Sequence, residues 1–147
     1  MVTLRQATRE DKAELLRLQQ QLYNPDPTLG AEIDAYFNTT SPIELMLVAA
    51  TENECLGAFI ELSKRDYAEG CKSSPVAYIE GIFVDHNLRR TGIGQQLMKA
   101  AESWARENGF TEMASDTKRG NLESISFHQT AGFEITEQIT CFRKQLM

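Results

Sequence analysis

A short segment of the chain combines two arginines with two glycines where a buried strand gives way to a helix. In residues 81–94 the apolar run Ile-Phe-Val leads into Asp-His-Asn-Leu-Arg-Arg-Thr-Gly-Ile-Gly, which opens the helix. The free N–H groups at a helix start bind anions, and the helix dipole adds to the attraction. Gly92 and Gly94 let a phosphate approach the backbone because they carry no Cβ. Arg89 and Arg90 can donate charge-assisted hydrogen bonds to it. The segment therefore predicts a diphosphate site.

Other phosphate-binding loops have different patterns. The segment is neither the GxGxxG of dinucleotide-binding folds nor a Walker loop, because no lysine follows the last glycine. A dinucleotide or a nucleoside triphosphate is therefore disfavoured. Taken alone, the segment is also compatible with a solvated arginine pair beside an ordinary tight turn.

The elements around this segment indicate an α/β fold. Apolar alternation predicts strands over residues 2–7, 45–50, 56–62, 76–84, 110–117 and 133–144. Helical periodicity predicts helices from Thr8 to a break at 24–27, over 28–37, from Gly92 to Asn108 and from Asn121 to Gly132. Gly81 interrupts its strand and predicts a β-bulge. The order β-α-α-β-β-β-α-β-α-β is typical of a mixed sheet with helices on both faces, here a single domain over residues 1–147.

Composition narrows the class of protein. The 147 residues are 41% hydrophobic and 24% charged, as in a globular domain. The net charge of −6 argues against nucleic acid and favours cationic partners. There is no signal-peptide core and no apolar run of the about 20 residues that span a bilayer, so we expect a cytosolic protein with no membrane partner. Three widely spaced cysteines and two histidines predict free thiols and no metal site.

Two motifs resemble those of the GNAT acetyltransferase superfamily. Residues 89–94, Arg-Arg-Thr-Gly-Ile-Gly, resemble its R/Q-x-x-G-x-G/A pyrophosphate motif. Asn121, Phe127-His128 and Gly132-Phe133 resemble its N-x5-F-Y-x3-G-F signature. The order of elements also matches. The resemblance implies the GNAT fold, with a central sheet splayed at the strand ending near Val84, and acetyl-CoA as co-substrate.

The resemblance also implies which residues hold acetyl-CoA. The backbone of Ile82, Phe83 and Val84 would pair with the pantetheine amides, and one N–H would stabilise negative charge on the thioester oxygen. The other expected contacts come from the turn and from the last helix: Arg89, Arg90, Thr91, Gly92, Ile93, Gly94, Gln95, Asn121 and His128. For His128 three roles are open: the acid for the leaving thiolate, a hydrogen-bond partner of CoA, or a packed helix residue.

Two carboxylates are candidates for the proton transfer. An ammonium has no lone pair, so the acceptor amine must lose a proton before it attacks, directly or through a water. Glu80 precedes the Gly81 bulge, and Asp116 ends the neighbouring strand. We expect both at the opening beside the cofactor strand. Cys71 has no visible base partner, which disfavours an acetyl-enzyme and favours direct transfer.

Residues from Asp66 onward resemble one branch of aminoglycoside 6′-N-acetyltransferases. The likeness is carried by residues 67–84, 113–116 and 128–133 and is loose over the first half. It implies that Tyr67, Glu80, Asp116 and Glu137 line a pocket for a polycationic sugar. The branch has Trp-Pro and a histidine after its first helix, where this chain has Tyr-Asn-Pro-Asp-Pro. Tyr23 and Asp26 are the expected substitutes.

Alternatives to an aminoglycoside acceptor are a polyamine, a small metabolite or a protein amine. A further alternative is a non-catalytic acyl-CoA-binding module, which would be expected to lack Glu80 and Asp116. Both residues are present. The resemblance also implies a homodimer, in which C-terminal strands and helices meet across a two-fold axis.

Overall fold

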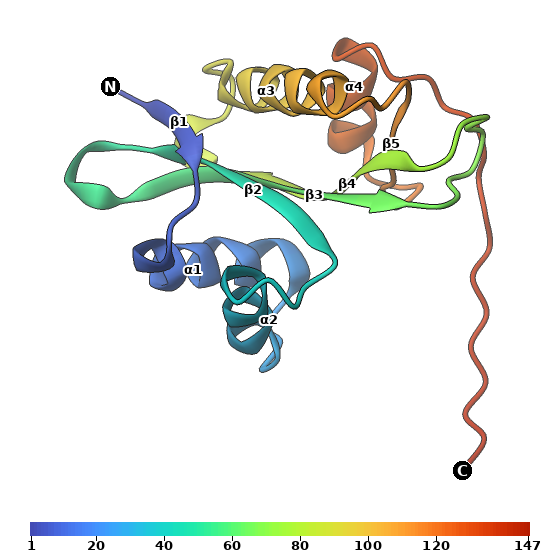
Figure 1. The fold of residues 1–147 in the computed structure, drawn as a ribbon, viewed down its shortest axis with the longest axis horizontal. Coiled ribbons are helices and arrows are strands. Elements are labelled where there is room, and N and C mark those ends of the chain that lie inside the picture. The colour runs from blue at the N-terminus through green and yellow to red at the C-terminus, as the bar shows by residue number, and fades with distance from the viewer.

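The computed structural model describes all 147 residues as one sheet covered by helices on both faces. The sheet contains β1 (Thr3–Gln6), β2 (Ile43–Ala50), β3 (Leu56–Arg65), β4 (Val76–Val84) and β5 (Met113–Ser115). The helices are α1 (Lys12–Tyr23), α2 (Leu29–Phe37), α3 (Ile93–Glu107) and α4 (Leu122–Thr130). In Figure 1, α1 and α2 lie below the sheet, and α3 and α4 lie above it. No helix is long and apolar enough to cross a bilayer.

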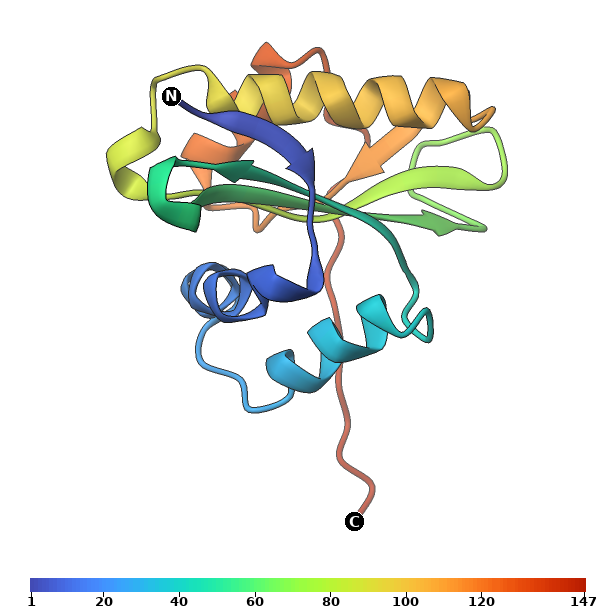
Figure 2. The same ribbon diagram turned by 60° about the vertical axis from the view of Figure 1, so that its left-hand side comes forward.

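The strands follow their order in the sequence, β1-β2-β3-β4-β5. The first four pair antiparallel, and β5 pairs parallel to β4 through the crossover helix α3. The turned view of Figure 2 shows the twisted sheet between its two helical layers. The predicted mixed α/β architecture is confirmed.

Two apolar clusters hold the layers together. Above the sheet, Ile60 and Leu62 of β3 pack with Leu97 of α3. Below it, Phe59 packs with Leu15 and Leu18 of α1, all fully buried. Because β3 is covered on both faces, its sequence is a nearly continuous apolar run rather than an alternating one. The central strands are thereby held rigidly, and this rigidity positions the site described below.

The predicted bulge in β4 is confirmed. Glu61 of β3 pairs with Gly81, but the next residue, Leu62, pairs with Ile79. Glu80 is therefore the extra residue of the bulge and has no partner in the ladder. The bulge thus leaves the backbone of Glu80 outside the register of the β3–β4 ladder.

The prediction of a closing strand over residues 133–144 is wrong, because the structure has no strand there. After α4 the chain leaves the body and runs outward as an extended tail with no ladder partner (Figures 1 and 2). The residues have the alternation of a strand, but a strand forms only where another edge satisfies its N–H and C=O groups. The neighbouring strand β5 is correspondingly short, with residues 113–115 in place of the predicted 110–117.

Candidate active site

A gap in pairing along β4 forms the first part of the site. The β4–β5 ladder covers only Ala77–Ile79 of β4. Beyond it, Ile82, Phe83 and Val84 stay paired to β3 on one edge, and no strand occupies the other. Backbone groups on that edge can pair with an extended ligand, which is the role that the family resemblance implies for these three residues.

The glycine–arginine turn follows this open edge directly. A short 3-10 turn, His86–Leu88, separates β4 from α3, which begins at Ile93. Gly92 is the N-cap of α3 with φ of 88°, and a Cβ built on it would meet nothing within 4 Å. The space beside Gly92, at the start of α3, is thus open to an anion. Arg90, which is exposed, also has a positive φ of 66°.

The remaining predicted cofactor residues surround the turn. Arg89 donates from Nε to the Val84 carbonyl at 2.9 Å and lies 3.7 Å from Glu123, so it fastens the turn to β4 and α4. The Thr91 hydroxyl donates to the Leu88 carbonyl. Gln95 lies on α3 with its amide 3.4 Å from the Phe127 carbonyl. Ile93 and Gly94 are buried, and a Cβ at Gly94 would come within 2.8 Å of Phe127.

Asn121 and His128 have structural partners within the chain. The Asn121 side chain accepts from the Ser124 N–H at 3.1 Å and so caps α4. His128 Nδ1 lies 2.7 Å from the Ser124 carbonyl oxygen, which can only accept, so Nδ1 carries the proton. Nε2 then accepts from the Ser115 hydroxyl at 2.8 Å. This geometry agrees with the packed-residue alternative for His128 and ties α4 to β5.

An acidic cluster lies on the lower face of the sheet, next to the open edge. The Glu80 carboxylate accepts from the Ser63 hydroxyl at 2.5 Å and from Arg65 at 2.7 and 2.9 Å. The Arg65 guanidinium lies 3.6 Å from the centre of the Tyr78 ring. The Tyr78 hydroxyl in turn donates to Asp116. The structure therefore connects the two predicted carboxylates through Arg65 and Tyr78.

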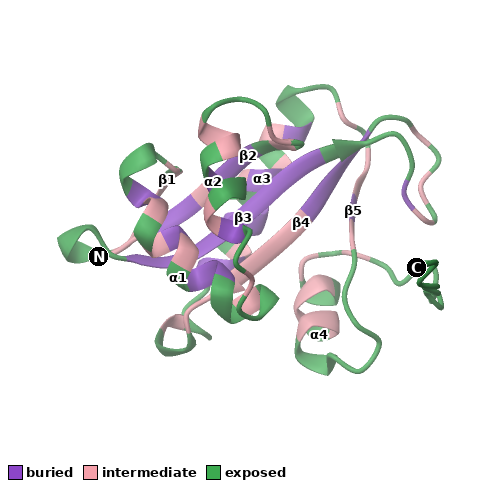
Figure 3. Cartoon of the chain, turned by 90° about the horizontal axis from the view of Figure 1, so that it is seen from below, coloured by how far each residue is buried: buried purple, intermediate pink, exposed green.

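The partners of Glu80 determine its charge. Burial acts to raise the pKa of Glu80, but hydrogen bonds from Arg65 and Ser63 outweigh it, and the pKa lies below its ordinary value. Glu80 is therefore ionised at neutral pH. Helices α1 and α2 cover one half of the lower face and leave the ends of β3 and β5 uncovered (Figure 3). A cation can approach the cluster from that side.

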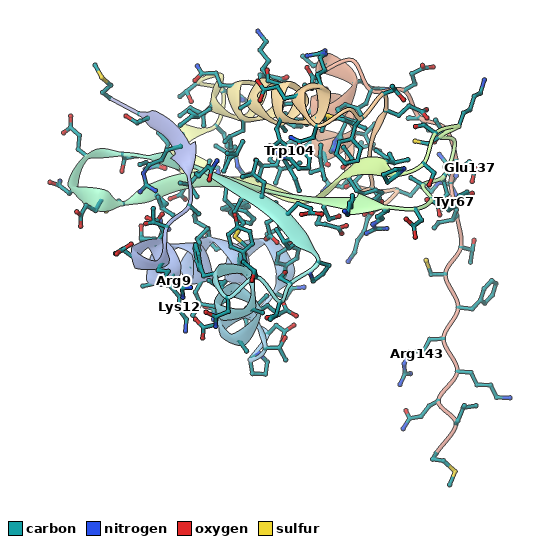
Figure 4. The ribbon with its side chains drawn as sticks, viewed as in Figure 1. Arg9, Lys12, Tyr67, Trp104, Glu137 and Arg143 are labelled. Atoms are coloured by element: carbon teal, nitrogen blue, oxygen red, sulfur yellow. The ribbon has the colours of Figure 1, made fainter.

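The other predicted pocket residues, on loops and on the tail, form no hydrogen bond or ion pair with Glu80 or Asp116. Tyr67 is 67% exposed on the loop before β4, and Glu112 fixes that loop by accepting from the N–H groups of Lys72 and Ser73. Glu137 lies on the tail beside this loop (Figure 4), where Thr136 donates to the Glu69 carbonyl. Asp26 accepts from Thr28 at 2.8 Å and shapes the turn before α2.

A buried glutamate beside Tyr23 at this face was missed by the sequence analysis. Tyr23, which the sequence predicts, ends α1 with its hydroxyl under the bulge. Glu61, which it does not, lies beside that hydroxyl and is only 6% exposed. The available signal was a glutamate inside the otherwise apolar run 56–62. An ionisable residue in such a run is rarely buried without a partner or a role.

Comparisons with known proteins show which family and which solved structures the chain resembles. Residues 10–133 match the model of the acetyltransferase (GNAT) family. Aminoglycoside N(6′)-acetyltransferase type 1 of Klebsiella aerogenes is 43% identical over 141 residues, 92% of this chain and 91% of that protein. AAC(6′)-Iy, solved with the bisubstrate analogue CoA-S-monomethyl-acetylneamine, superposes with a TM-score of 0.88 at 32% identity over 99% of both chains. AAC(6′)-Ih from Acinetobacter baumannii gives 0.83 at 31% identity over 100% of both.

Replacing Gly92 tests the phosphate turn. We expect Gly92→Leu to weaken acetyl-CoA binding by roughly tenfold or more, about 1.4 kcal/mol, because the side chain fills the open approach and strains a positive φ. Isothermal titration calorimetry measures the affinity. Gly109→Leu is the matched control, since Gly109 has φ of 82° in open space at the other end of α3. Equal effects of both substitutions would contradict the placement.

The buried Glu61 predicts a pH-dependent stability. Burial raises its pKa to about 7 from an ordinary 4.5, so the protonated form favours the folded state. That contribution is complete below about pH 4.5 and is lost as the pH rises to about 7, a change of about 3 kcal/mol. We expect the free energy of unfolding of the native chain, relative to Glu61→Gln, to fall by this amount between these pH values. Urea denaturation measures it, and a constant difference would contradict the burial of a titrating carboxyl.

Proposed function

Since the chain belongs to the GNAT acetyltransferase family, we propose that it transfers an acetyl group from acetyl-CoA to the 6′-amino group of aminoglycosides. The observation that carries the proposal is the acidic cluster of Glu80 and Asp116 beside the open edge of β4. It puts negative charge for an amine next to a site for the acetyl donor. The relatives of this length carry the aminoglycoside 6′-acetyltransferase name.

Acetyl-CoA fits the open edge and the turn. Its diphosphate is negatively charged, and the unobstructed amides at Gly92 offer it hydrogen bonds at a helix start. Its pantetheine amides can pair with the backbone groups that residues 82–84 direct to the open edge of β4, where the Val84 carbonyl already accepts from Arg89. An N–H there would stabilise the negative charge that forms on the thioester oxygen. The acetyl group would then lie near the bulge at Glu80.

The acceptor is held by charge. An aminoglycoside carries several ammonium groups, and the lowered pKa of Glu80 keeps this carboxylate ionised to bind one of them. Glu80 then takes the proton that the amine must lose, directly or through a water, with Asp116 beside it. Tyr67 and Glu137 can contact the outer part of the sugar from the loop and the tail. The free amine attacks the thioester carbonyl, and CoA leaves as the thiol.

Cys71 is not the nucleophile in this proposal. Burial and the neighbouring Glu112 raise the pKa of its thiol, so it stays protonated. All three cysteines are free thiols, as expected in a reducing compartment. We therefore place the reaction in the cytosol and without a covalent acetyl-enzyme.

The direct test is free-thiol release from acetyl-CoA with a panel of acceptors. We expect release with kanamycin and tobramycin and none with 6′-hydroxyl analogues, because only the 6′-amine attacks. Spermidine and a peptide panel test the other acceptor classes. Release with those acceptors and with no aminoglycoside would contradict the proposal.

A variant of Glu80 belongs to the same test. Glu80→Gln keeps the shape but cannot take a proton, so we expect kcat to fall about 100-fold or more while acetyl-CoA affinity changes little. Glu44→Gln is the control, since it breaks an ion pair with Lys64 in the same sheet, away from the cluster. An unchanged kcat would remove Glu80 as the base.

We also propose that the protein is a homodimer held by its tails. The tail, residues 134–147, leaves four large apolar side chains exposed by 58% to 93%: Ile135, Ile139, Phe142 and Leu146. β5 offers an unpaired edge beside a groove of about 350 Å³ that Phe110, Met113 and Phe133 line. The tail alternates as a strand does, so the tail of one copy can pair with the open β5 edge of a second copy. The family match ends at residue 133, where the tail begins.

Charge placed on the tail tests the dimer. We expect the full chain to sediment as a dimer at micromolar concentration and Ile139→Lys to sediment as a monomer, because a charge would replace an apolar side chain of the tail. Gln138→Lys, on the other side of the alternating segment, is the control and should remain dimeric. A monomeric native chain would contradict the proposal without affecting the assignment of the reaction.

A further inference from the structure

Beneath the β4 bulge lies a carboxylate that the proposed reaction does not use. Glu61 of β3 is 6% exposed and forms no ion pair. Its Oε1 accepts from the Gln19 amide at 2.9 Å and lies 3.3 Å from the Tyr23 hydroxyl, both on α1. Burying an ionised carboxylate with only neutral partners is unfavourable, so burial favours the protonated form of Glu61. This position therefore calls for a function.

The Tyr23 hydroxyl links Glu61 to the acceptor site. It lies 3.3 Å from Oε1 of Glu61 and also 3.3 Å from the main-chain oxygen of Glu80. A tyrosine hydroxyl has one hydrogen, so it can donate to one of these two oxygens at a time. A Cβ added to Gly81 would lie 1.9 Å from this hydroxyl, so the glycine is what lets Tyr23 reach the bulge.

The proton on Glu61 selects between the two arrangements. When Glu61 is ionised, it accepts from Tyr23, and the Glu80 carbonyl loses that donor. When Glu61 is protonated, it can donate to the tyrosine oxygen, and the tyrosine hydrogen can turn to the Glu80 carbonyl. Glu80 is the unpaired bulge residue, so without Tyr23 its carbonyl is available to an N–H of the acceptor amine.

We propose that Glu61 is a positioning residue: acting through the Tyr23 hydroxyl, its proton decides whether the Glu80 carbonyl is free to orient the acceptor amine. This role rests on the proposed acetyl transfer and deepens it. The Glu80 carboxylate holds the charge of the amine, and the carbonyl of the same residue fixes the direction of its lone pair. No covalent step passes through Glu61.

The groups around Glu61 place its ionisation near neutrality. Burial raises the pKa of Glu61 to about 7, the Tyr23 and Gln19 hydrogen bonds act against this, and the charges of Glu32 on α2 and Glu80 on β4 add to it. The neighbour on β2 is the apolar Met46. Burial and the same carboxylates raise the pKa of Tyr23, so its hydroxyl keeps its hydrogen. A polycation bound at the cluster would favour the ionised form of Glu61 by simple attraction.

The kinetic test compares pH profiles as ratios. For kanamycin, kcat/KM of Glu61→Gln is divided by that of the native chain at each pH, which cancels the titration of the substrate amine. The glutamine oxygen accepts from Tyr23 at every pH, so we expect the ratio to fall by up to about tenfold from pH 6 to pH 8 as native Glu61 ionises. Tyr23→Phe should show the same fall, because it removes the link.

Asp34→Asn is the matched control, since it removes a carboxylate of α2 that pairs with Lys12 and does not act on the pKa of Glu61. Its ratio should stay flat. A purely structural role for Glu61 would lower the activity of Glu61→Gln equally at all pH values, and such a flat ratio would overturn the proposal.

A second measurement does not depend on activity. In native protein with 13C-labelled tyrosine and glutamate, we expect the Cζ resonance of Tyr23 to shift with pH at the same midpoint as the Cδ resonance of Glu61. Glu61→Gln should abolish the Tyr23 shift. Separate midpoints, or no Tyr23 shift, would overturn the coupling. A native chain that acetylates no aminoglycoside would instead overturn the proposed function, and the resonances would still decide the coupling.

Discussion

The site depends on a single break in strand pairing along β4. Up to Ile79 the strand is paired on both edges, and beyond it only β3 remains as a partner. The bulge at Glu80 falls at this transition, so the extra residue, the free backbone and the open edge occupy one place. The strand stays in position because both faces of β3 are packed against helices. Without the break, an extended ligand would find no backbone groups to pair with.

On the lower face of the sheet, each carboxylate of the acidic cluster has a partner that stabilises its ionised form. Arg65 pairs with Glu80 and lies over Tyr78, which holds Asp116. Such a network keeps a carboxylate ionised without leaving it unpaired in a partly buried site. Glu61 is the opposite case, because its partners are neutral and its pKa is raised to about 7. The two glutamates, on the neighbouring strands β3 and β4, thus differ in pKa because of the groups around them.

The tail has the sequence pattern of a strand but no strand partner within its own chain. Residues 134–147 alternate as a strand does, but the only hydrogen bond to the body is that of Thr136 to Glu69. The same chain leaves the edge of β5 without a partner. The alternation determines which side chains of a strand lie on its apolar face. It does not determine which strand edge, in the same chain or in a second copy, the segment pairs with. The prediction of a closing strand failed within the chain for this reason.

The sequence by itself determined the elements whose causes are local. The turn at Gly92, the bulge at Gly81, the cap at Asn121 and the bounds of α3 follow from residues a few positions apart, because capping and backbone freedom act over that range. Only the tertiary structure decided the partners of the carboxylates. Arg65 meets Glu80 and Gln19 meets Glu61 across 15 and 42 residues, through strand register and helix packing. Those contacts set the charge of each group, and no local pattern encodes them.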